Sequence, residues 1–293
     1  MTETMSVDRA DNGHGATLDQ VVQRISVTRK KRHRRHRITI LLCQVGVAVL
    51  FVACWQLFSG TPGKDRFALI DSFYVSRPSA VLTTLRTWFA DGSVYRHILV
   101  TSEETVIGFV LGAAIGLFLG LALGSNQFLG KVLSPFVSAA YSVPRLALVP
   151  LFVLWFGLGL SSKIVYIVMV VFFLVFFNTF SGVREASQDL MNILRVMGAG
   201  RWHLLAKVSI PSAMTWMLTG LRVSVPYALV AAVTAEIVSS NQGLGYLLVR
   251  SSNQFYVQGV FAAIALMVAL SLVMLGLVVA LESWLLRWKR STS

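Results

Sequence analysis

Long apolar runs separated by shorter polar segments dominate the pattern of hydrophobic and polar positions along the chain. A helix needs about 20 mainly apolar residues to cross the hydrocarbon core of a bilayer. Six segments meet this length and predict membrane-spanning helices at residues 38–59, 99–124, 134–156, 164–180, 213–237 and 260–281. We therefore expect an all-α membrane protein whose six transmembrane helices form a single transmembrane domain over residues 38–290.

The segment between the first two predicted spans contains a shorter helical pattern. Its apolar residues recur at the spacing of one helix face, at Val81, Leu82, Leu85, Trp88 and Phe89. We expect a short amphipathic helix here that lies in the membrane interface.

Glycines recur at every fourth position of the second predicted span, at Gly108, Gly112, Gly116, Gly120 and Gly124. Glycines along one ridge of a helix let a neighbouring backbone approach closely, which is a common packing device in membranes. We therefore expect this ridge to pack against another span.

Composition agrees with a membrane protein. Of 293 residues, 55% are hydrophobic and only 13% are charged, and the mean hydropathy is +0.69. The net charge of +13 would suit a nucleic-acid-binding protein, but nine of the 26 Lys and Arg residues precede residue 38 instead of lining a soluble face. Residues 1–37 are expected to form a flexible basic tail, with residues 29–37 against anionic lipid.

The distribution of Lys and Arg predicts the orientation of the chain, because these residues concentrate in cytoplasmic loops. Seventeen lie in the N-terminal tail, the loops at residues 125–133 and 183–210, and the C-terminal tail, whereas seven lie in the segments on the opposite side. We therefore expect a multi-pass protein with both termini in the cytoplasm.

No pattern typical of a catalytic or nucleotide-binding site occurs in the sequence. The phosphate-binding motif GxxxxGK[ST] is absent, as is any metal-spaced cluster of His and Cys. Cys43 and Cys54 lie too far apart on one predicted helix to form a disulfide. We expect a chain that is not an enzyme and that binds no metal or cofactor.

The loop at residues 183–210 carries a second helical pattern. Four apolar residues share one helix face, namely Leu190, Ile193, Leu194 and Met197. Because the other loops are short, we expect a partner protein to cover this face. Gly198 is expected to end the helix in a left-handed conformation, and Pro211 to begin the fifth span.

This loop resembles the coupling loop of permeases of ATP-binding-cassette (ABC) importers, whose signature is EAA, three residues, Gly, nine residues and Ile-x-Leu-Pro. Gly198, Val208, Ile210 and Pro211 match its later positions, whereas Asn192-Ile193-Leu194 replace EAA. Further motifs are similar to those of the nitrate/sulfonate/taurine permease subfamily, at residues 143–151, 154–159, 162–164, 220–222, 235–236, 243–246 and 281–288. The resemblance covers roughly residues 75–290.

The resemblance implies a type I ABC importer permease fold in a bacterial inner membrane. Two permease copies, expected to form a homodimer, would enclose a path for a small organic or inorganic anion such as a sulfonate, taurine or nitrate. An external binding protein would deliver the solute, and ATPase subunits holding ATP and Mg would bind the coupling loop. The coupling residues implied are Leu190, Asn192, Ile193, Leu194, Met197, Gly198, Ala199, Arg201 and Pro211.

Ionisable residues inside spans are costly and suggest function, so three are candidates for the translocation path: Arg145, Arg222 and Glu236. Arg145 follows Pro144, which lacks a backbone N–H and is expected to kink the third span. Arg222 and Glu236 share a helix face about 21 Å apart and cannot pair directly on a straight helix. They either line the path, where an arginine would attract an anion, or are held by backbone carbonyls or a neighbouring span.

Two other functions are compatible with six spans. An autonomous channel or secondary carrier would need no ATPase, although we detect none of the internal repeats that many carriers contain. An intramembrane enzyme would need acid, base, nucleophile or metal-binding residues at suitable spacing, and the sequence lacks them. Co-purification of an ATPase would distinguish the permease from the channel or carrier.

Overall fold

The computed structural model of the protein describes residues 39–60, 70–185 and 188–285. The chain divides into two compact units, Met1–Pro78 and Ser79–Ser293. Within the described residues, five helices are long and apolar enough to cross a membrane, and a bent pair of shorter helices brings the number of candidate spans to six. The tail predicted at residues 1–37 and the last eight residues lie outside the described residues.

The first unit contributes one of these helices, Thr39–Phe58, which has no buried residue in its most apolar stretch. Cys43 and Cys54 lie on this helix as free thiols. Two short strands follow it, β1 (Ser59–Gly60) and β2 (Ile70–Asp71), which pair in parallel with Ser59 opposite Ile70. The sequence pattern did not predict these strands.

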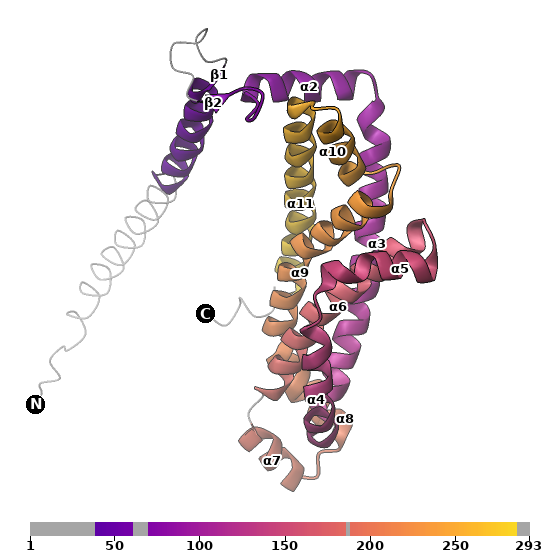
Figure 1. Cartoon of the computed structure of the whole chain (residues 1–293). Helices are drawn as coiled ribbons and strands as arrows, with labels where there is room; N and C mark the ends of the chain where they lie inside the picture. The colour runs from indigo at the N-terminus through magenta and orange to yellow at the C-terminus, as the bar shows by residue number, and fades with distance from the viewer. Residues whose placement is uncertain (1–38, 61–69, 186–187, 286–293) are drawn as a thin grey trace, which may run out of the picture. The chain divides into compact units, whose positions relative to one another are not determined.

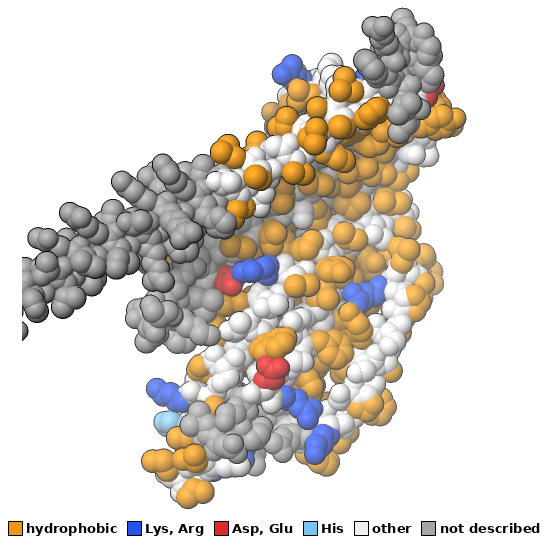
Figure 2. Space-filling view, turned by 90° about the vertical axis from the view of Figure 1, so that its left-hand side faces the viewer, with side chains coloured by type: hydrophobic (Ala, Val, Ile, Leu, Met, Phe, Trp, Pro, Cys, Tyr) orange, Lys and Arg blue, Asp and Glu red, His pale blue; other side chains and the backbone are white. Residues whose placement is uncertain are grey.

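The second unit is a bundle of helices. Its elements are, in chain order, α2 (Pro78–Ala90), α3 (Ser93–Ser125), α4 (Gln127–Tyr141), η1 (Arg145–Leu148), α5 (Val149–Phe156), α6 (Leu160–Arg184), α7 (Gln188–Val196), α8 (Arg201–Leu204), η2 (Leu205–Ser209), α9 (Ile210–Ser239), α10 (Leu244–Asn253) and α11 (Val257–Leu285). In Figure 1, α2 and α10 lie at one end of the bundle, and α7 and α8 lie at the opposite end. Hydrophobic side chains cover much of the face in Figure 2, as expected for a surface in contact with lipid.

The core of the bundle forms where α6 packs against both α3 and α9. Ile167, Val171 and Val175 of α6 are fully buried, as are Ala228 and Ala232 of α9. The small alanines on α9 and the glycines on α3 let the three helices pack closely around the larger residues of α6.

The glycine ridge of α3 lies against α6. A Cβ atom added at Gly112 would lie 2.8 Å from the carbonyl oxygen of Val168, and one added at Gly116 would lie 2.9 Å from that of Phe172. The other glycines of the ridge face α6 in the same way. The two backbones are therefore so close that no side chain fits between them at these positions.

The third predicted span, residues 134–156, is broken in the structure. α4 and the η1–α5 segment are bent by 79° relative to each other, with the break after Tyr141. Pro144 lies in this break, where its missing N–H and its restriction on the preceding residue oppose a continuous helix. The kink expected at Pro144 is therefore a complete break, and the third predicted span is a bent pair of helices, which is either a broken span or a re-entrant loop.

The amphipathic pattern between the first two spans forms α2, on which Val81 and Thr84 are buried. The Thr84 hydroxyl lies 2.8 Å from the hydroxyl of Tyr256, which connects α2 to the segment between α10 and α11. After α2, the backbone N–H of Ser93 donates to Asp91 Oδ1 at 2.9 Å as α3 begins. This hydrogen bond lowers the pKa of the Asp91 carboxyl group.

Candidate functional site

A group of polar side chains lies where α10 begins beside α3 and α9. Glu236 of α9 is 1% exposed, and both of its carboxylate oxygens accept hydrogen bonds. Thr101 Oγ1 donates to Glu236 Oε1 at 2.6 Å, and the N–H of Gly245 donates to Glu236 Oε2 at 2.6 Å. The N–H of Leu244 in turn donates to Thr101 Oγ1 at 2.8 Å. These side chains therefore bind the free N–H groups in the first turn of α10, where a carboxylate is favourable.

Two glycines make this arrangement possible. Gly243 has a φ of +107° and lies against the Glu236 carboxylate, so that a Cβ atom there would collide with it. A Cβ atom at Gly245 would lie 2.6 Å from the carbonyl oxygen of Val233. The Gly-Leu-Gly sequence at residues 243–245 is thus required for α10 to approach α9.

A buried ion pair connects α3 to α6 next to this cap. Lys163 Nζ donates to Glu104 Oε1 at 2.6 Å, and the two residues are 6% and 1% exposed. Lys163 Nζ also donates to Ser240 Oγ at 2.9 Å, in the connection between α9 and α10. Three elements therefore meet at a single ammonium group.

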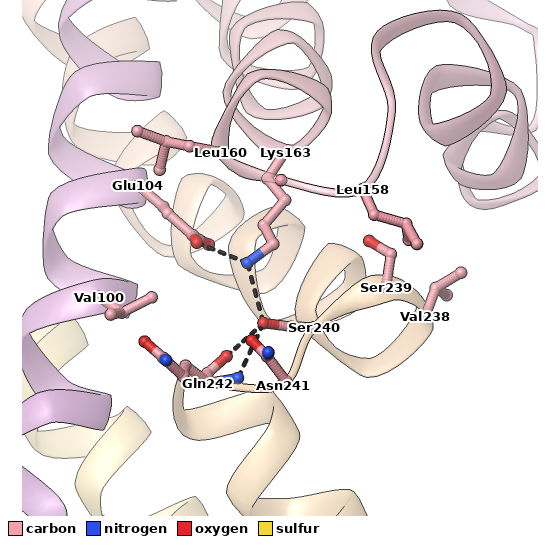
Figure 3. A pocket seen from close by; sticks show the side chains of 11 residues that line it. Val100, Glu104, Leu158, Leu160, Lys163, Val238, Ser239, Ser240, Asn241 and Gln242 are labelled. Atoms are coloured by element: carbon pink, nitrogen blue, oxygen red, sulfur yellow. Dashed lines mark hydrogen bonds and ion pairs between the residues drawn. The ribbon is translucent and has the colours of Figure 1, made fainter.

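The ion pair borders a cavity of about 580 Å³, within the size range of small-molecule sites. Figure 3 shows the Lys163 ammonium group between the Glu104 carboxylate and Ser240, with Asn241 and Gln242 nearby. Apolar residues complete the wall, among them Val100, Leu158, Leu160 and Val238. The cavity combines an apolar lining with a few polar groups, which is typical of a binding site.

The structure separates the three ionisable residues proposed for the path. Glu236 caps α10, whereas Arg222 forms an ion pair with Glu282 of α11. The Arg145 guanidinium lies over the ring of Tyr141, 4.4 Å from its centroid. Arg222 is therefore held by a neighbouring span, one of the two alternatives left open by the sequence.

Neither Glu104 nor Lys163 is among the site residues predicted from the sequence. The pattern at residues 101–104 indicates only a polar start to the second span, and Lys163 counts as a loop residue. In the structure α3 begins at Ser93 and α6 at Leu160, so both charged residues lie within helices. The predicted second span, residues 99–124, already contains Glu104, so the rule that a charge inside a span requires a partner could have identified it.

The predicted coupling segment contains α7, which ends as its sequence predicts. Gly198 has a φ of +87°, and its N–H donates to the carbonyl oxygen of Arg195 at 2.9 Å. The N–H of Ala199 donates to the carbonyl oxygen of Leu194 at 2.9 Å, which completes the usual glycine-ended helix terminus. The left-handed conformation predicted for Gly198 is confirmed.

The apolar residues of α7 divide between two environments. Leu194 packs with buried Met191 against Val208 of η2, so that the chain itself covers part of the predicted face. Ile193 and Met197 are 58% and 76% exposed. The Leu190 and Arg201 side chains lie outside the described part of the structure. Asn192 Oδ1 accepts a hydrogen bond from Arg195 Nη1, and Pro211 lies in the first turn of α9.

Comparisons with known proteins agree with this arrangement. Residues 112–287 match the family model described as "Binding-protein-dependent transport system inner membrane component". The formylaminopyrimidine transport permease protein ThiX of Halalkalibacterium halodurans is 32% identical over 73% of this chain and 86% of its own length. The taurine transport system permease protein TauC of Escherichia coli is 28% identical over 74% of this chain and 78% of its own length.

The fold is also similar to a solved structure, an inward-facing conformation of the MetNI methionine ABC transporter. The match has a TM-score of 0.56 and 20% sequence identity, and it covers 66% of this chain and 94% of the MetNI chain. The similarity confirms the type I importer permease fold, and the family match covers most of the helical bundle. The chain therefore belongs to the family of inner membrane components of binding-protein-dependent transport systems, as a permease subunit of an ABC importer.

Proposed function

We propose that a homodimer of this permease forms the path of an importer for a small organic anion, and that α7 receives the movement of an ATPase partner. The chain supplies membrane spans but no nucleotide-binding motif, so ATP and Mg would be held by the partner. An external binding protein would deliver the solute, as the family description implies. The name of the relative TauC refers to taurine, which supports a small organic solute with an anionic sulfonate group.

The observation that carries the coupling role is the exposed apolar surface at the end of α7. Ile193, Val196 and Met197 are 58%, 89% and 76% exposed. Ile193 and Val196 lie on α7, and Met197 directly follows it, outside the candidate spans. An exposed apolar group of this kind is favourable when a partner protein covers it.

The proposed orientation places α7 in the cytoplasm and α2 and α10 on the outer side. The two groups of helices lie at opposite ends of the bundle (Figure 1). The excess of Lys and Arg in the tails and in the 183–210 loop supports this assignment, and both termini would then be cytoplasmic.

The test is retention of a co-expressed ATPase by a variant that carries both Ile193→Asp and Met197→Asp. Burying an unpaired carboxylate in an interface costs several kcal/mol. The variant is expected to insert into the membrane normally but to lose the ATPase on an affinity column. These two positions are better suited than Leu194, which also packs within the chain.

Leu82→Asp is the matched control, because Leu82 is an exposed apolar residue of α2 at the opposite end of the bundle. The control is expected to retain the ATPase. Wild-type stoichiometry in the α7 variant would show that another surface binds the ATPase. Failure of the wild-type protein to bind any ATPase would favour an autonomous channel or carrier.

A further inference from the structure

We propose that the buried carboxyl groups of Glu104 and Glu236 share a single proton, and that this proton joins α3 to α9. One carboxyl group donates its O–H to the other, which remains ionised. The proton-binding site is therefore the contact between the two carboxyl groups, beside Lys163. This inference concerns the membrane-spanning bundle itself and goes beyond the proposed function, because it depends on neither the solute nor the ATPase.

The two carboxyl groups lie in contact although they belong to different helices. Thr101 and Glu104 are three residues apart on α3 and therefore share one face of that helix. Thr101 Oγ1 donates to Glu236 Oε1 at 2.6 Å, which brings Glu236 of α9 against this face. The Glu104 carboxyl group lies within hydrogen-bonding reach of the Glu236 carboxyl group. Both residues are 1% exposed, so neither carboxyl group is in contact with bulk solvent.

The hydrogen bonds around the pair are complete except for one proton. Both oxygens of Glu236 accept hydrogen bonds, from Thr101 and from the N–H of Gly245. Glu104 Oε1 accepts from Lys163, but no donor among the described residues reaches the buried Glu104 Oε2. Ionised carboxylates only accept hydrogen bonds, whereas a protonated carboxyl group also donates one. A proton between Glu104 Oε2 and Glu236 therefore satisfies the atom that is otherwise without a partner.

The charges of the cluster lead to the same conclusion. Two carboxylates in contact repel each other strongly where water is excluded, and paired carboxyl groups of this kind retain one proton. With one shared proton, the remaining carboxylate balances the Lys163 ammonium group, which α6 places 2.6 Å from Glu104. The negative charge of exposed Glu103 on α3 also acts on Glu104 and adds to the repulsion. The first turn of α10 contributes a backbone N–H, that of Gly245, to the pair.

The shared proton connects elements that meet where α10 begins. Glu236 binds the first turn of α10, and Glu104 holds Lys163, which in turn donates to Ser240 in the α9–α10 connection. A movement that separates α3 from α9 would part the two carboxyl groups and admit water between them. The protonated carboxyl group would then ionise and release its proton to that water. Opening of this contact is thus linked to the loss of one proton.

The test is the infrared spectrum of the purified full-length permease at neutral pH. A protonated carboxyl group has a C=O stretching band at a higher frequency than the bands of a carboxylate. Exposed Asp and Glu side chains are ionised at this pH, so they do not contribute to that band. The detergent must lack ester groups, because ester carbonyls absorb nearby. The wild-type protein is expected to show the band of a protonated carboxyl group.

Glu104→Gln assigns the band to the proposed pair. The glutamine side chain can direct an N–H toward Glu236 and its oxygen toward Lys163, so it replaces the contact without a shared proton. The variant is expected to lose the band and to unfold close to the wild-type temperature. Glu103→Gln is the matched control, because it removes the exposed neighbouring carboxyl group, and it is expected to keep the band.

Glu236→Gln gives a second assignment that does not depend on how the first variant folds. Glu104 would then face Lys163 without a second carboxyl group and remain ionised, so the band is again expected to disappear. The spectrum of this variant is recorded well below its unfolding temperature. Absence of the band from the wild-type protein would overturn the proposal without any variant. Full intensity of the band in either folded variant would assign it to another carboxyl group and would also overturn the proposal.

Discussion

Two buried glutamates near the start of α10 have different environments, although both lie in membrane-spanning helices. Glu236 is surrounded by donors and connects α9 to α3 and α10. Glu104 shares one oxygen with Lys163 and has a second oxygen without a donor among the described residues. The two carboxylates are thus buried to the same degree but differ in the number of donors that surround them.

Glu236→Gln is expected to destabilise the permease, because the amide has one acceptor oxygen where the carboxylate offers one each to the Thr101 hydroxyl and the N–H of Gly245. An unsatisfied buried donor costs about 1–3 kcal/mol. The expected result is a lower unfolding temperature of the detergent-purified protein, with the exposed Glu103→Gln as control. An unchanged unfolding temperature would show that Glu236 is not required as the cap of α10.

Sequence patterns predicted part of the candidate site. Glu236 was noticed because it is charged within an apolar run, and the same reasoning applies to Arg222. Arg222 pairs with Glu282, which lies 60 residues further along the chain. A local sequence pattern does not predict a contact between residues so far apart in sequence. Lys163 was assigned to a loop because hydropathy alone did not place the start of its helix. Local patterns thus identified charged residues but not the contacts that determine their roles.

At the scale of whole elements, the close packing of α3 against α6 is the main structural feature of the bundle. The four-residue spacing of the glycines predicted that another helix packs closely against α3. It did not identify that helix as α6, since the local sequence of one helix does not specify which helix packs against it. The bend between α4 and α5 was anticipated only as a kink at Pro144, because a proline predicts an interruption and not its angle.

Gly116→Leu tests the packing of α3 against α6. A side chain at this position would meet the carbonyl oxygen of Phe172 at 2.9 Å and Val175 Cβ at 3.0 Å, so the helices must separate. We expect lost assembly or an unfolding temperature lower by several degrees, since overpacking costs about 1–3 kcal/mol. Gly276→Leu on α11 is the control, because no atom lies within 4 Å of a Cβ there. Equal stability of the two variants would contradict the role of the ridge.

At the scale of the whole molecule, the orientation in the membrane decides which surfaces meet which partners. Exposed Ser93, at the start of α3, and exposed Met197, at the end of α7, belong to opposite ends of the bundle. The positive-inside rule assigns the α7 end to the cytoplasm. Under this assignment the α2 end is accessible to an external binding protein, and the α7 end to an ATPase.

Single cysteines test this orientation in a background in which Cys43 and Cys54 are replaced by alanine. Ser93→Cys is expected to react with an impermeant thiol reagent on intact cells, because the residue would face outward. Met197→Cys is expected to react only after lysis. The reverse pattern of labelling would invert the proposed orientation, although the fold itself would be unaffected.

The close packing of α3 and α6 has a mechanical consequence. α6 begins beside Lys163 and ends at Arg184 near the coupling segment, and its 25 residues span about 37 Å. The glycines of α3 bring its backbone into direct contact with α6, with no α3 side chain between the two helices at these positions. We therefore expect the two helices to resist sliding and rotation and to move as one rigid unit. A displacement at the α7 end would therefore tilt the α3–α6 pair as a whole and change the separation of Lys163 and Ser240 at its other end. The position of the ATPase and the contacts of Lys163 would then be two measures of the same rigid tilt.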